Sequence, residues 1–141
     1  MKLFLTLLML VSTTTFAHDD ATLDKMKAPG GGQLRMAGAY HIELVVAKDS
    51  PQAKENPLII YVTDHADAKL PGAGMKASVT MFAGGAKVVA DLKPDGDNRL
   101  KGVARYASAP NMKAVVSLNA PDGKTVQARF TPLEKAAVHV H

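Results

Sequence analysis

Apolar side chains occupy every second position in most segments of the chain after residue 39. In the sequence YHIELVV, for example, Ile42, Leu44 and Val46 alternate with His41 and Glu43, which is the two-residue period of a β-strand. No segment shows a clear 3.6-residue period of the kind that marks an amphipathic helix. The sequence therefore predicts an all-β fold.

Glycine-containing turn signals divide the second half of the chain. Gly84-Gly85, Asp95-Gly96 and Asp122-Gly123 are typical of the turns that join antiparallel strands. We expect five strands here, following one another as a meander, at residues 75–82, 86–92, 98–106, 112–119 and 125–131. Strands at 40–46 and 56–64, with one more at most before them, bring the total to seven or eight. This spacing predicts an immunoglobulin-like antiparallel β-sandwich.

The flanking segments differ in composition from the predicted sandwich. Residues 1–17 combine Lys2, an apolar run and a small-residue exit at Ala17, which predicts a cleaved signal peptide and export to a bacterial periplasm. Residues 18–32 are polar and then glycine-rich, which predicts a flexible arm. The sandwich domain is expected at 33–132 and a C-terminal tail at 133–141. No membrane span is predicted after processing.

Composition argues against several classes of function. The chain has 141 residues and no cysteine, so disulfides and thiolate chemistry are excluded. Its net charge of +4 becomes +3 once Lys2 is removed, and the lysines are scattered among acids, which argues against a nucleic-acid partner. No nucleophile motif or phosphate-binding loop is present. We therefore expect a protein that is not an enzyme.

The five histidines are the remaining candidates for a chemical role, as metal ligands. Cleavage after Ala17 would make His18 the first residue, where an α-amine and an imidazole can chelate one metal ion. In an extended tail, His139 and His141 project to the same side and can share a metal. Together these groups favour copper by the affinity order of divalent metals, with zinc or nickel behind it. The alternative is that both ends of the chain are simply solvated.

A second group of candidate ligands lies within the predicted sandwich. His41 and Glu43 share one face of a strand, and Asp64, His65 and Asp67 follow a neighbouring strand in the sequence TDHAD. The alternative interpretation is a surface pair beside an acidic turn. Methionine could add soft thioether ligands for Cu(I). Met75 and Met81 fit the period of a core strand, whereas three others are less well explained by packing: Met26, Met36 and Met112.

Three segments, APGGGQLRMAGAYHIELVV, LIIYVTDHADAKL and LKPDGDNRLKG, resemble small exported bacterial proteins found in heavy-metal resistance settings. They are also similar to a segment of periplasmic adaptor subunits of metal-efflux pumps. Members typically carry His-Gly-Gly at the position of residues 30–32, and a Tyr-His-x-Glu-Leu motif that Tyr40, His41, Glu43 and Leu44 match. Gly30 replaces the histidine and cannot coordinate through a side chain. The resemblance implies a periplasmic, metal-linked β-sandwich.

These observations lead to two functional hypotheses. The first is a non-catalytic periplasmic protein that binds a divalent metal, with copper first, for buffering or for delivery to an efflux component. The second is a β-sandwich interaction module whose exposed edges pair with another periplasmic protein and whose histidines are incidental. Oligomeric state is left open by the sequence.

Overall fold

Eight antiparallel strands and one short helix make up the part of the chain that the computed structural model describes, residues 20–26 and 28–134. The predicted signal peptide, His18, His139 and His141 lie outside these residues. The elements are α1 (Asp20–Lys25), β1 (Gln33–Ala37), β2 (Tyr40–Val46), β3 (Lys54–Thr63), β4 (Lys76–Ala83), β5 (Ala86–Pro94), β6 (Arg99–Tyr106), β7 (Lys113–Asn119) and β8 (Thr125–Phe130).

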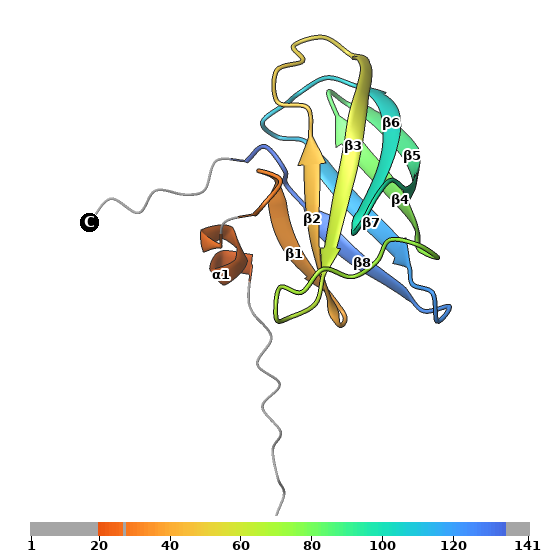
Figure 1. Ribbon diagram of the computed structural model, residues 1–141. Helices are drawn as coiled ribbons and strands as arrows, with labels where there is room; N and C mark the ends of the chain where they lie inside the picture. The colour runs from red at the N-terminus through yellow and green to blue at the C-terminus, as the bar shows by residue number, and fades with distance from the viewer. Residues whose placement is uncertain (1–19, 27, 135–141) are drawn as a thin grey trace, which may run out of the picture.

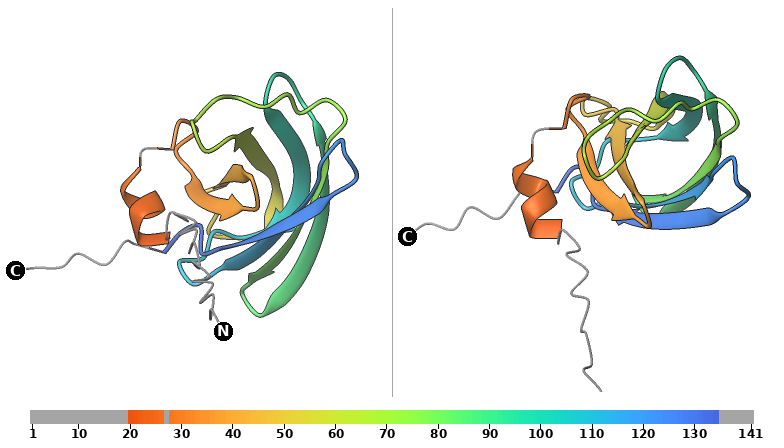
Figure 2. Two further views of the ribbon diagram at one scale, coloured as in Figure 1. Left: turned by 90° about the horizontal axis from the view of Figure 1, so that it is seen from below. Right: turned by 60° about the horizontal axis from the view of Figure 1, so that its bottom comes forward.

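The strands form one sheet in the order β1-β2-β3-β6-β5-β4-β7-β8, in which each neighbouring pair is antiparallel. The sheet curls so that β1, β2, β3 and β6 face β4, β7 and β8, while the end of β5 joins the two layers (Figures 1 and 2). In Figure 2 the sheet is almost closed on itself. The predicted all-β antiparallel fold of seven or eight strands is confirmed, and the described residues form eight.

The predicted meander is wrong at its fourth strand. β4, β5 and β6 follow one another as expected, but β7 pairs with β4 and not with β6. The reason is that the other edge of β6 is already paired with β3 along eight residues, from Lys54 opposite Tyr106 to Tyr61 opposite Arg99. The chain therefore crosses between the layers after Tyr106, and β7 adds to the open edge of β4.

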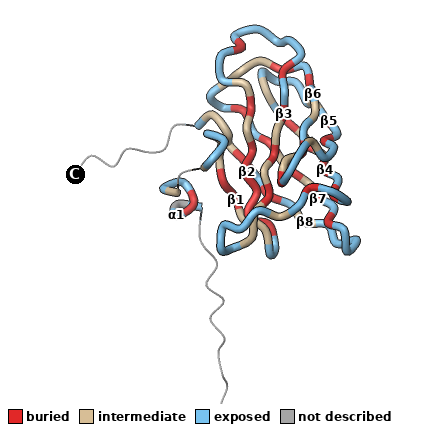
Figure 3. Tube along the Cα trace, viewed as in Figure 1, coloured by how far each residue is buried: buried red, intermediate tan, exposed pale blue. Residues whose placement is uncertain are grey.

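The core lies between the two layers and consists of the inward-facing half of each strand. Ile42, Leu44, Ile60 and Val79 are completely buried, as are the equivalent positions of most other strands, and Figure 3 shows the buried positions concentrated along the strands. Because the chain has no disulfide, this apolar burial, worth about 25 cal/mol per Å², supplies most of the stabilisation.

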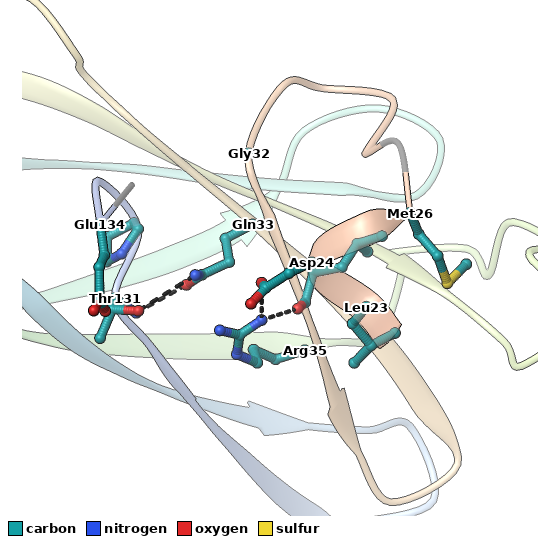
Figure 4. A pocket seen from close by; sticks show the side chains of 10 residues that line it. Leu23, Asp24, Met26, Gly32, Gln33, Arg35, Thr131 and Glu134 are labelled. Atoms are coloured by element: carbon teal, nitrogen blue, oxygen red, sulfur yellow. Dashed lines mark hydrogen bonds and ion pairs between the residues drawn. The ribbon is translucent and has the colours of Figure 1, made fainter. Parts of the chain in front are cut away.

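The two ends of the sheet, β1 and β8, lie side by side and are bridged by a side chain. The Gln33 amide donates to Thr131 Oγ1 at 3.3 Å and accepts from the Thr131 backbone N–H at 2.8 Å. Figure 4 shows the Gln33 side chain reaching Thr131. A side-chain amide thus replaces ladder hydrogen bonds where the curled sheet meets itself.

Within the segment predicted to be an arm, α1 lies against the outside of β1 (Figure 1). Leu23 is only 1% exposed, and Arg35 of β1 binds Asp24 at 2.8 Å and Asp20 at 3.5 Å. The contacts to Asp24 are visible in Figure 4. The helix has one leucine and two acids four residues apart, which is not an apolar stripe. The sequence therefore gives little indication of this helix.

No helix among the described residues is both long enough and apolar enough to cross a membrane.

Tyr106, at the end of β6, is buried and forms hydrogen bonds to β3 and to the residue that follows β2. Its hydroxyl donates to the carbonyl of Pro57 in β3 at 2.6 Å and accepts from the N–H of Ala47, just after β2, at 2.8 Å. Burial raises the pKa of this hydroxyl above its ordinary value of 10.0, and the hydrogen bond from Ala47 partly opposes the shift. The folded state therefore holds the phenolic proton more tightly than the unfolded chain does.

Replacing this tyrosine, Tyr106→Phe, should lower the free energy of unfolding by about 1–3 kcal/mol, because the buried Ala47 N–H loses its acceptor. In the parent protein, stability should also fall as pH rises above about 10, where the unfolded chain releases the proton first. The Tyr106→Phe variant should lack this part of the decrease in stability with rising pH. Urea denaturation at pH 7 to 11 measures both effects, with Tyr40→Phe, at the other end of β2, as control. Equal stabilities and slopes for parent and Tyr106→Phe would contradict the assignment.

Candidate functional site

His41 and Glu43 lie on the face of β2 that points away from the core, yet they are 0% and 1% exposed. The strand register places Met36 of β1 opposite His41, and Tyr61 of β3 opposite Glu43. The alternative interpretation, a pair on the protein surface, is therefore wrong. Two loops cover the outer face of β2, one formed by residues 28–32 and the other by residues 64–69.

The Glu43 carboxylate holds the first loop in place. Oε1 accepts the backbone N–H of Gly30 at 2.9 Å and Oε2 accepts that of Gly32 at 2.8 Å. Only glycine permits this approach, because a Cβ at Gly32 would collide with the Leu44 carbonyl oxygen and one at Gly30 would lie 2.6 Å from the Tyr61 ring. Gly30, Gly32 and Glu43 all belong to the segment that resembles the heavy-metal resistance proteins, and in this chain they bind one another.

The second loop is shaped by Asp64. Its Oδ1 accepts the N–H groups of Ala66 and Ala68 at 2.8 and 2.9 Å, which is how aspartate side chains stabilise turns. Asp67 then adopts a φ of 61°, the only positive φ of a non-glycine residue in the described chain. Aspartate tolerates this conformation better than most residues, and here it directs the chain so that Asp67 comes close to β2.

The loop at residues 64–69 and the hairpin between β1 and β2 bring two histidines together. The ring centroids of His41 and His65 are 4.8 Å apart and the rings meet edge to face. Nε2 of His65 lies 3.1 Å from the carbonyl oxygen of Gly38, in the β1–β2 turn. Nδ1 of His41 lies 3.6 Å from Oδ1 of Asp67. His41 is buried, whereas His65 is exposed.

This arrangement resembles the surroundings of metal-binding histidines. Such a residue commonly directs one ring nitrogen to a carboxylate or a backbone carbonyl, which fixes the ring and leaves the other nitrogen to coordinate. Here Asp67 would orient His41 for coordination through Nε2, and Gly38 would orient His65 for coordination through Nδ1.

The described residues do not provide a complete set of metal ligands. Nowhere in residues 20–26 and 28–134 do three histidine, aspartate or glutamate side chains group in a way that could hold a metal ion. Glu43 is engaged by the glycine loop and Asp64 by its own turn. The other predicted ligands, His18, His139 and His141, lie outside the described part.

The sequence places Asp67 in the loop after β3 with Asp64 and His65, but it does not predict the approach of Asp67 to His41. That approach depends on the left-handed backbone conformation of Asp67.

A cavity of about 490 Å³ opens between the two loops beside the histidine pair. Met26 and Gly30 line it from the side of the first loop, Asp67 and Lys69 line it from the second loop, and Glu43 also borders it. Neither His41 nor His65 is among the residues that line this cavity.

No known family model matches the chain, and no curated protein matches its sequence. The resemblance to exported proteins of heavy-metal resistance therefore stays a prediction.

The variant Glu43→Gln should reduce stability by about 1.5–3 kcal/mol, the range for a hydrogen bond to a charged group. A carboxylate accepts both glycine N–H groups, whereas an amide presents an NH₂ donor to one of them. Hydrogen exchange should accelerate at Gly30 or Gly32, measured by NMR. The matched control is Glu55→Gln, on an exposed position of β3. Unchanged exchange at both glycines would show that the carboxylate does not hold the loop.

Proposed function

We propose that the protein binds a divalent metal ion through His41 and His65, without catalysing a reaction. The observation that supports this proposal most directly is the approach of the two imidazoles, from β2 and from the loop after β3, to 4.8 Å. Each ring also has a neighbouring oxygen that can orient it, on Asp67 for His41 and on Gly38 for His65. These supporting groups are of the kind that tune metal affinity.

The donor set favours copper, with zinc or nickel as alternatives. Imidazole nitrogen suits all three metals, and the general affinity order places Cu(II) above the others. With His41 buried against β1 and β3, an ion bound here would be partly shielded from solvent. The sequence resemblance implies a periplasmic, metal-linked protein, and we infer that such a protein buffers the metal or delivers it to an efflux component.

The rival hypothesis is an interaction module that pairs with a partner through exposed strand edges. In this fold the two terminal strands of the sheet, β1 and β8, lie against each other, and Gln33 and Thr131 bridge them. This arrangement leaves little edge for a further strand, which favours the metal-binding proposal over strand addition.

We expect the processed protein to take up Zn(II), a redox-silent probe, at neutral pH in isothermal titration calorimetry. His65→Asn should weaken binding by about tenfold or more, since loss of even a supporting group costs 10- to 100-fold. This position is exposed, so the change should leave the fold intact. The double variant His139→Asn/His141→Asn is the control for the C-terminal histidines.

Absence of Zn(II) and Cu(II) uptake by the parent protein would contradict the proposal. So would an affinity that is unchanged in His65→Asn and also in His41→Asn, with folding of both variants checked by circular dichroism.

A further inference from the structure

Met36 lies on the outer face of β1 beside the histidine pair. The β1–β2 register places it directly opposite His41, and side chains in directly opposed positions of an antiparallel pair share one face with Cβ atoms about 4.5–5.5 Å apart. Met36 is half-buried, whereas Met75, Met81 and Met112 are buried in the core cluster. Packing in the core explains those three methionines but not Met36.

His65 reaches the same end of the hairpin from a different part of the chain. Its Nε2 contacts the carbonyl of Gly38, which is two residues after Met36 and three before His41. The ring of His65 is also in edge contact with that of His41. Three donors of different origin, from β1, β2 and the loop after β3, therefore gather at the β1–β2 turn.

We propose that Met36 completes the site as a thioether ligand and that the resulting two-histidine, one-methionine set binds Cu(I). This inference rests on the proposed function and adds the oxidation state of the metal to it. Thioether sulfur is a soft donor that selects Cu(I) over harder ions, and imidazole is also compatible with copper. The thioether carries no charge and no proton, so it supplies a third donor without burying a carboxylate beside Glu43.

Met36 is distinguished from the other methionine close to the two loops. Met26 lines the cavity between the loops, on the side formed by the segment after α1. Met26 has no strand register that places it opposite a histidine, so Met26→Leu is the matched control for Met36→Leu. Both substitutions conserve volume and apolar character, and such exchanges usually cost less than about 1.5 kcal/mol.

The test uses the processed full chain loaded anaerobically with one equivalent of Cu(I). X-ray absorption at the copper edge should show a copper–sulfur shell in the parent protein and in Met26→Leu, but not in Met36→Leu. Competition with a chromophoric Cu(I) chelator should show a loss of affinity of about tenfold or more for Met36→Leu, comparable to the loss of a group in a metal site. Zn(II) affinity should change by less than about twofold, because zinc gains little from a thioether.

A copper–sulfur shell that persists in Met36→Leu, that is missing from the parent, or that disappears in Met26→Leu would overturn the inference. If the parent binds Zn(II) through His41 and His65 while Cu(I) affinity does not depend on Met36, only the thioether ligand is refuted. If the parent protein binds neither Zn(II) nor copper, both the proposed function and the Met36 ligand are refuted.

Discussion

The outer face of β2 is organised by one buried carboxylate. Glu43 points away from the core, and a charged group there is tolerable in a buried state only when its oxygens are bound. The N–H groups of Gly30 and Gly32 supply this binding at 2.9 and 2.8 Å. The glycine loop must therefore fold back over β2, and it brings the segment that follows α1 with it.

Buried apolar side chains occur in two places in the molecule. The main core fills the space between the layers, while Leu23 of α1 and Leu34 of β1 are buried outside that cluster. The Arg35 ion pairs with Asp20 and Asp24 fix α1 beside this smaller region. His41 is buried on the same outer face, and the loop carrying His65 and Asp67 approaches it. The candidate metal site thus belongs to the covered outer face and not to the core between the two layers.

The fold could be predicted to a large extent because it depends on local alternation. The alternation at residues 40–46 predicts a strand, and β2 has the same bounds. Gly84-Gly85 connects β4 to β5, as the turn signal predicts. The position of β7 could not be predicted in this way, because it depends on which sheet edge is open once β3 has paired with β6. Alternation places Glu43 on the outer face of β2, but the period of a strand does not show what will cover that face. His41 and His65 were both candidates, but their proximity and the role of Asp67 follow from loop conformation alone.

The most direct test of the account is a long-range ¹H–¹⁵N NMR correlation of the histidine rings during addition of one equivalent of Zn(II). We predict that His65 coordinates through Nδ1 with its proton on Nε2, toward Gly38, and that His41 coordinates through Nε2 with its proton on Nδ1, toward Asp67. Each tautomer gives a distinct pair of nitrogen shifts, and both rings should change together at one equivalent. Unchanged signals from His41 and His65, while only the other three histidines respond, would contradict the central claim.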